Sequence, residues 1–137
     1  MSLLVLDASV TLAWCFPDED PSYAVFTRNA ARESELIAPS LWPFEVANGL
    51  LVAERKRRLK PGDAGRFLGL LDALDVDVEL ASTAIAAACV AIARNHSLSV
   101  YDASYLELAV RRKSRLATLD GALAKAARNT GVLLAPL

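Results

Sequence analysis

The sequence predicts an α/β fold in which helices cover both faces of a central parallel sheet. Leu3 to Leu6 is an apolar run without alternation, which is typical of a strand buried on both faces of a parallel sheet. Further short apolar runs follow, separated by segments whose apolar residues recur at helical spacing. The 137 residues suffice for one domain with a substantial core, so we expect a single domain over residues 1–137.

The first half of the chain alternates helical segments with short apolar runs. Phe26 and Ala30, for example, lie one helical turn apart. Ser40 is a predicted N-cap, with Pro43 in the first turn of the helix that follows. An acidic turn over residues 17–21 is bracketed by prolines. These signals predict helices over residues 9–16, 23–31, 41–58 and 63–74, and a strand over residues 36–38.

The second half continues the alternation. Val76 to Leu80 alternates apolar and acidic residues, which predicts a strand with one solvated face at an edge of the sheet. Ser82 or Thr83 opens an alanine-rich helix that ends near Asn95, a residue that tolerates a left-handed cap. The remaining signals predict helices over residues 102–113 and 122–128, and strands over residues 115–119 and 132–134.

Composition excludes several classes of protein. The formal net charge of −1 gives no overall attraction to nucleic acid or to an anionic membrane, although local basic runs can supply contacts. Cys15 and Cys89 lie far apart without CxxC or CxxH spacing, which argues against a disulfide scaffold and a zinc site. No apolar run has membrane-spanning length. We therefore expect a cytoplasmic protein that does not associate with membranes.

Four acidic residues are placed so that they can converge. Asp7 and Asp120 each end an apolar run, and α/β proteins bind ligands at the carboxyl ends of parallel strands. Glu45 lies one turn into its helix among apolar neighbours, and Asp102 begins its helix. Carboxylates without His or Cys suit Mg²⁺ or Mn²⁺, which can activate water or stabilise charge on a phosphoryl group. The sequence therefore predicts a metal site at these four acids.

Three further polar residues stand beside this set. Ser9 and Thr118 flank two of the acids, and we expect their hydroxyl groups to orient the carboxylates by hydrogen bonds. Asn48 is three residues beyond Glu45, so both lie on the same helix face. The three aspartates also stand where a helix N-cap stands, so a plain capping role is the alternative for each of them.

Two basic runs allow contacts to a nucleic acid. One comprises Arg55 to Arg58 with Lys60, and the other comprises Arg111 to Lys113 with Arg115. Such runs can bind RNA phosphates. They also complement the helix dipole, because both stand where a helix ends. Both interpretations remain open from the sequence.

Four segments carry a family resemblance through their order and spacing. They are Leu4-Val5-Leu6-Asp7-Ala8-Ser9, Trp42-Pro43-Phe44-Glu45-Val46-Ala47-Asn48, Leu98-Ser99-Val100-Tyr101-Asp102-Ala103-Ser104-Tyr105 and Leu116-Ala117-Thr118-Leu119-Asp120. Together they resemble PIN-domain proteins, and specifically the VapC-type toxins of bacterial toxin–antitoxin pairs. The resemblance implies a three-layer α/β/α fold with sheet order 3-2-1-4-5. It also implies a metal-dependent endoribonuclease with the four acids Asp7, Glu45, Asp102 and Asp120 around Mg²⁺.

The same resemblance implies the partners. The expected substrate is structured RNA, either tRNA or ribosomal RNA, and the expected inhibitor is a small VapB-like antitoxin. A homodimer is also expected. Two other interpretations stay open. A phosphoryl-transfer domain of receiver or haloacid-dehalogenase type also has acids at strand ends, but the latter needs a second Asp where this chain has Ser9. The other is a non-catalytic interaction module whose acids are helix caps.

Overall fold

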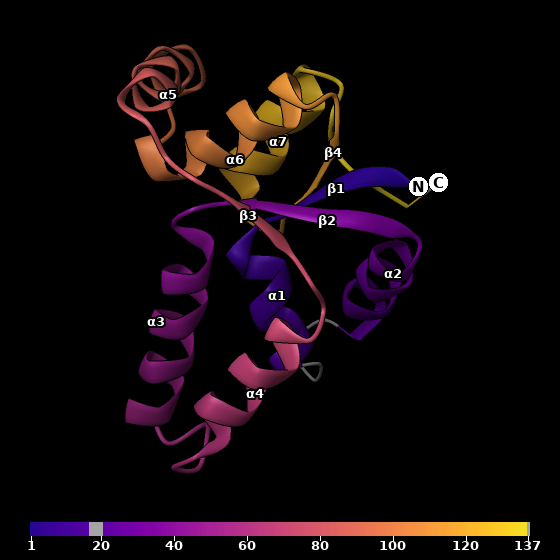
Figure 1. Cartoon of the computed structure of the whole chain (residues 1–137), viewed down its shortest axis with the longest axis vertical. Coiled ribbons are helices and arrows are strands. Elements are labelled where there is room, and N and C mark those ends of the chain that lie inside the picture. Colours follow the sequence, from indigo (N-terminus) through magenta and orange to yellow (C-terminus); the bar gives the residue numbers. More distant parts are fainter. Residues whose placement is uncertain (17–20, 137) are drawn as a thin grey trace.

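The computed structural model describes residues 1–16 and 21–136, and it places a parallel sheet between two layers of helices (Figure 1). The strands are β1 (Ser2–Leu6), β2 (Ser34–Pro39), β3 (Asp77–Glu79) and β4 (Arg115–Ala117). The helices are α1 (Ala8–Cys15), α2 (Pro21–Arg32), α3 (Trp42–Arg55), α4 (Asp63–Asp72), α5 (Thr83–His96), α6 (Val100–Arg111) and α7 (Gly121–Asn129). Helices α1 to α4 lie on one side of the sheet and α5 to α7 on the other. The predicted α/β fold class is confirmed. The acidic turn predicted over residues 17–21 falls outside the described residues, except for Pro21, which begins α2.

The strand order is β3-β2-β1-β4, and all pairs are parallel. This agrees with the first four places of the order 3-2-1-4-5. The fifth strand, predicted over residues 132–134, is reduced to a single parallel bridge between Leu116 and Leu133. Because β4 is only three residues long, it offers few backbone groups for another strand to pair with. The short β3 lies at the opposite edge, where the sequence predicts it.

The central position of β1 explains its apolar run. Leu4, Val5 and Leu6 are 2%, 0% and 0% exposed. Leu4 and Leu6 pack with Val10 of α1 on one face, whereas Val5 belongs to the cluster that contains Leu108 of α6. Because both faces are covered, no position of this strand from Leu4 onward favours a polar residue.

Several helix starts differ from the sequence prediction. Leu41, not Ser40, is the N-cap of α3, and no side chain caps that helix. In α6 the N-cap is Ser99, whose hydroxyl accepts a hydrogen bond from the Asp102 backbone N–H at 3.0 Å. Asp102 therefore lies inside the first turn and does not begin the helix. At the end of α5 the left-handed residue is Ser97, with φ of 54°, and not Asn95.

Ion pairs attach β3 to α6. The Arg111 guanidinium donates to both oxygens of Glu107, at 2.7 and 2.9 Å, and also to Glu79 of β3. Glu107 is only 6% exposed, so this arginine neutralises a buried carboxylate. The hydrogen bond from Arg111 also holds the pKa of Glu79 below its usual value. Arg111 of the second basic run is thus occupied within the fold.

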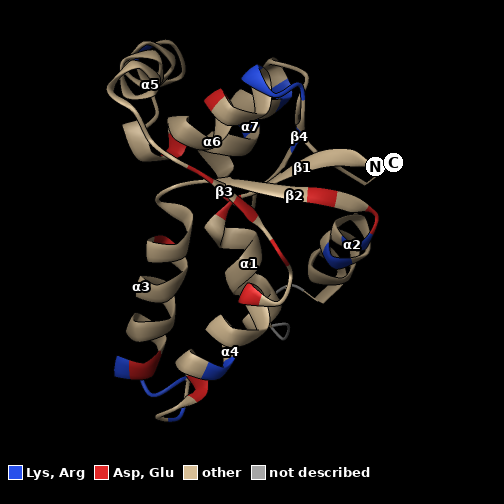
Figure 2. Cartoon of the chain, viewed as in Figure 1, with Lys and Arg blue, Asp and Glu red and all other residues tan. Residues whose placement is uncertain are grey.

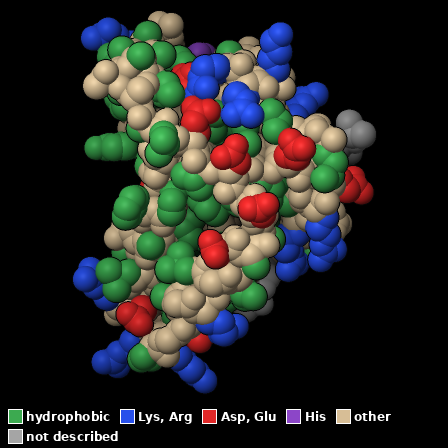
Figure 3. Space-filling view, in the orientation of Figure 1, with side chains coloured by type: hydrophobic (Ala, Val, Ile, Leu, Met, Phe, Trp, Pro, Cys, Tyr) green, Lys and Arg blue, Asp and Glu red, His purple; other side chains and the backbone are tan. Residues whose placement is uncertain are grey.

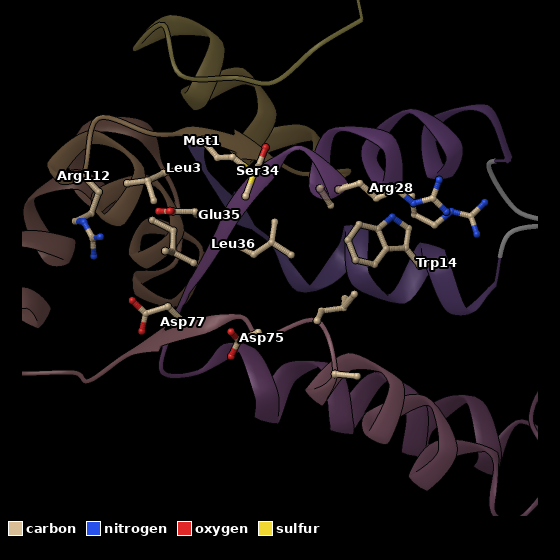
Figure 4. Close-up of a pocket in the computed structure, with 15 residues that line it drawn as sticks. Met1, Leu3, Trp14, Arg28, Ser34, Glu35, Leu36, Asp75, Asp77 and Arg112 are labelled. Atoms are coloured by element: carbon tan, nitrogen blue, oxygen red, sulfur yellow. The ribbon is translucent and has the colours of Figure 1, made fainter.

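The first half of β2 has an open edge. β3 pairs only with residues 37–39 of β2, so within the described ranges no strand pairs with residues 34–36 on that side. A hollow of about 710 Å³ lies there, with Trp14 and Arg28 on one side of β2 and Leu3 and Arg112 on the other (Figure 4). This hollow is at the amino ends of the strands. None of the described helices combines the length and the apolar content that crossing a bilayer requires.

Candidate metal centre

Asp7 directly follows β1 at the carboxyl end of the sheet. Its backbone N–H donates to the carbonyl of Ala117 at 3.0 Å, which continues the pairing of β1 with β4. Asp7 is the N-cap of α1, yet its carboxylate forms no capping bond. Instead Oδ2 accepts hydrogen bonds from Ser9 Oγ and Thr118 Oγ1, both at 2.7 Å. Burial raises the pKa of Asp7, the charge of Asp120 raises it further, and the two hydroxyl bonds oppose the rise.

Glu45 reaches the same edge from the first turn of α3. The indole N–H of Trp42, at the start of α3, donates to Thr11 Oγ1 of α1 at 2.9 Å. This buried bond sets where α3 begins relative to the sheet. The hydroxyl of Tyr105 in α6 donates to Glu45 Oε1 at 2.5 Å. Partial burial raises the pKa of Glu45, as do the charges of Asp7 and Asp102, whereas the Tyr105 bond lowers it.

The other two acids have different surroundings. Asp102 is not the cap of its helix, because Ser99 holds that position. Burial raises the pKa of Asp102, and the charges of Asp120 and Asp7 raise it further. Asp120 does cap its helix, since Oδ2 accepts from the Leu123 backbone N–H at 2.9 Å. A capping role is thus present for Asp120 and absent for the carboxylates of Asp7 and Asp102.

The charges of the four acids are linked: Asp7 and Asp102 act on Glu45, Asp120 and Asp7 act on Asp102, and Asp120 acts on Asp7. Asp7, Glu45 and Asp102 each have a pKa raised by at least one other member of the group. Within the described ranges, no Lys or Arg forms an ion pair with any of the four. In the same part of the chain, no three His, Cys, Asp or Glu side chains are already gathered closely enough to share a metal ion. An uncompensated, all-oxygen donor set is the kind that suits a hard divalent cation.

The three predicted supporting residues behave differently. Ser9 and Thr118 both bind the Asp7 carboxylate, and Thr118 Oγ1 also accepts from the Asp120 backbone N–H at 3.0 Å. Asn48 is exposed, and no hydrogen bond joins it to Glu45. Tyr105 contacts Glu45 although the sequence analysis does not single it out. The available signal is a tyrosine on a buried helix face, since a buried hydroxyl needs a partner.

Comparison with known proteins identifies the family. The model of the PIN domain family matches residues 4–129. The chain belongs to the PIN-domain family. It is 33% identical over 123 residues to Ribonuclease VapC3 of Pyrobaculum aerophilum, a match that covers 89% of this chain and 92% of the relative. The resemblance to VapC-type PIN proteins, carried in the sequence by four short segments, is thereby confirmed.

A solved structure supports the same PIN-domain fold. The crystal structure of PAE2754 from Pyrobaculum aerophilum aligns with a TM-score of 0.69 at 24% identity, covering 91% of this chain and 79% of that one. At this identity the comparison bears on the fold alone. Because the chain belongs to the PIN-domain family, it is not a receiver or haloacid-dehalogenase domain.

Proposed function

We propose that this PIN-domain protein is a divalent-cation-dependent endoribonuclease, the toxin of a toxin–antitoxin pair. Its proposed reaction is hydrolysis of phosphodiester bonds in structured RNA, either tRNA or ribosomal RNA, in the cytoplasm. The family and the name of the relative, Ribonuclease VapC3, support nuclease activity. The observation that carries the proposal is the group of four acids, in which the charge of at least one other member raises the pKa of Asp7, Glu45 and Asp102 and no described Lys or Arg forms an ion pair with the group.

In this proposal Asp7, Glu45, Asp102 and Asp120 hold the cation, which is Mg²⁺ or Mn²⁺. Such a cation, when bound, lowers the pKa of water and neutralises charge on phosphoryl oxygens. Ser9 and Thr118 orient the Asp7 carboxylate through their hydroxyl bonds, and Tyr105 orients Glu45. These bonds limit the rotation of two carboxylates before a cation arrives. Asn48, three residues beyond Glu45 in α3, is exposed, and its role as a supporting residue stays a prediction.

The direct test is RNA cleavage by the purified protein. We expect cleavage with Mg²⁺ or Mn²⁺ and its loss in excess EDTA, and we expect Asp7→Asn to abolish it. Sequencing RNA ends after induced expression would identify the RNA and the bond. Full cleavage in EDTA would refute the metal-dependent reaction. Absence of both cleavage and metal binding would favour the non-catalytic interaction module.

An apolar surface supports the proposed small antitoxin as partner. Leu51 and Val52 of α3 are each 37% exposed, Leu70 of α4 is 57% exposed, and Leu74, just beyond α4, is 42% exposed. Hydrophobic side chains also gather between α3 and α5 on the face shown in Figure 3. Surfaces of this kind commonly bind an amphipathic helix or a second copy of the chain. Co-expression with a small protein encoded immediately upstream should yield a stable complex and restore growth. A homodimer without such a complex would contradict the antitoxin part of the proposal.

A further inference from the structure

Two exposed aromatic residues directly precede two of the proposed metal ligands in the sequence. The chain has nine aromatic residues, all of them described, and only Phe44 and Tyr101 are exposed, at 79% and 68%. Phe44 immediately precedes Glu45, and Tyr101 immediately precedes Asp102. Large exposed rings next to a reactive group indicate a binding surface, because burying them elsewhere would be more favourable for folding alone.

The two rings come from different helices that meet at the acids. Phe44 is in the first turn of α3, and Tyr101 is in the first turn of α6. The hydrogen bond from Tyr105 to Glu45 joins these helices one turn beyond Tyr101. The two rings therefore belong to the first turns of the two helices that carry Glu45 and Asp102.

Of the two basic runs, the first lies far from the acids, and Arg111 of the second is engaged within the fold. The run of Arg55 to Arg58 lies where α3 ends, and the 14 residues of that helix span about 21 Å from the end that carries Glu45. Figure 2 shows these basic residues at the tip formed by α3 and α4. In the second run, Arg111 is occupied by Glu79 and Glu107. These two runs therefore leave contacts to the nucleotides at the cleaved bond to other side chains.

We propose that Phe44 and Tyr101 are stacking platforms for unpaired nucleobases on the two sides of the cleaved phosphodiester. This inference rests on the proposed ribonuclease function and specifies its substrate as a single-stranded stretch, such as a loop. Unpaired RNA bases commonly stack on aromatic side chains, and such stacking tolerates any base. Tyr101 also lines an apolar slot of about 210 Å³ together with Leu80 and Val100.

The test measures cleavage kinetics on a defined RNA. The probe is a single-stranded RNA of about twelve nucleotides that spans the bond mapped in total cellular RNA. We expect Phe44→Ala and Tyr101→Ala each to raise KM by about tenfold or more with a smaller effect on kcat, since stacking contributes mainly to binding. Phe44→Trp and Tyr101→Phe keep an aromatic face and should retain the wild-type KM. Val25→Ala is the matched control, because Val25 is 47% exposed on α2 and should not affect cleavage.

An abasic RNA separates stacking from an indirect effect. In this RNA, the base on one side of the cleaved bond is removed. One of the two alanine variants should then raise KM no further, because the base that stacks on its ring is already missing. Thermal unfolding of each variant checks that the fold is intact, as expected for exposed positions. A paired duplex spanning the same bond should be cleaved at least tenfold more slowly than the single strand.

The outcomes distinguish this inference from the proposed function. No cleavage by the wild-type protein with Mg²⁺ or Mn²⁺ would refute the ribonuclease itself. Wild-type cleavage with unchanged KM in both alanine variants would overturn the stacking platforms alone. If those variants cleave normally but no longer bind the small upstream protein, Phe44 and Tyr101 belong to a protein interface, and the RNA inference is wrong. Equal cleavage of duplex and single strand would also overturn it.

Discussion

Among the three aspartates, Asp102 gives the sharpest test of whether the carboxylate binds a metal or only caps a helix. Ser99 caps α6, so Asp102→Asn removes a negative charge without removing the capping side chain. Because the charges of Asp120 and Asp7 act on Asp102, its removal should relieve repulsion. We expect the melting temperature in EDTA to rise by a few degrees, the stabilisation by Mg²⁺ to shrink, and cleavage to be lost.

Ser99→Ala is the control for this change. Loss of the cap should destabilise the protein by about 1 kcal/mol in both EDTA and Mg²⁺. The Mg²⁺-induced increase in melting temperature should stay as in the wild type. If Asp102→Asn keeps full cleavage and full Mg²⁺ stabilisation, then Asp102 is not a ligand.

Thr118 tests how the Asp7 carboxylate is oriented. Thr118→Val keeps the shape of the side chain but removes the hydroxyl that donates to Asp7 Oδ2. That bond lowers the pKa of Asp7, so its loss should raise this pKa further. Isothermal titration calorimetry across pH should therefore show that Mg²⁺ binding by this variant requires a higher pH than binding by the wild type. Thr130→Val removes a hydroxyl bond to Ala126 in α7 and should leave the pH profile of Mg²⁺ binding unchanged.

The raised pKa values of Asp7, Glu45 and Asp102 determine the sign of the pH effect on stability. Each carboxyl binds its proton more tightly in the folded protein than in the unfolded chain. Their contribution to the free energy of unfolding is therefore fully present below the unfolded pKa and is lost as pH rises through the folded pKa. In EDTA, urea unfolding should show stability falling as pH rises above about 4. Asp7→Asn should reduce this fall in stability. An unchanged pH profile would contradict the repulsion among these carboxyl groups.

At the level of elements, Arg111 holds the edge strand β3 against α6. Arg111→Ala would leave the buried carboxylate of Glu107 without its cation. We expect a loss of about 2 kcal/mol in the free energy of unfolding, together with faster amide exchange in β3. Arg94→Ala, at an exposed position of α5, is the matched control and should change stability little. Adding Glu107→Gln to Arg111→Ala should recover part of the loss, and its failure to do so would contradict a charge effect.

The order and type of the elements follow from local patterns, whereas several details depend on contacts that those patterns do not contain. Ser99 and Asp102 are both good N-caps, and only the position of α6 decides between them. Asn48 shares a predicted helix face with Glu45. In the fold, the next residue, Gly49, lies against the side chain of Leu12, and Asn48 is exposed. The fifth strand is a single bridge because its length is limited by its neighbour β4.

The candidate site also has some features that the sequence shows and others that depend on the packing of the fold. The four acids are recognisable because each stands at a strand end or in the first turn of a helix, which the sequence shows directly. The bond between Glu45 and Tyr105 joins residues 60 positions apart, and the bond between Asp7 and Thr118 joins residues 111 positions apart. Such pairs are set by the packing of α3, α6 and β4 around the sheet. A single sequence does not contain that information.

Across the whole molecule, the two ends of the sheet have different charge. The four acids at the carboxyl ends form no ion pair with a described Lys or Arg, whereas the hollow at the amino ends carries both signs, with Arg28, Arg32 and Arg112 beside Glu35, Asp75 and Asp77. The run of Arg55 to Arg58 lies at a third place, the tip formed by α3 and α4 (Figure 2). If RNA reaches from the acids along α3, its phosphates pass this tip.

This arrangement predicts the salt dependence of RNA binding. Each phosphate contact that is lost should reduce the slope of log affinity against log salt by about one unit. Lys56→Gln with Arg57→Gln should therefore lower the slope by about one to two, measured by fluorescence anisotropy with the RNA probe in Mg²⁺. Arg28→Gln with Arg32→Gln changes the net charge equally but at the far end of the sheet, so the slope should stay as in the wild type. Equal losses in both double variants would show that RNA responds to net charge alone and that the α3 tip binds no phosphate.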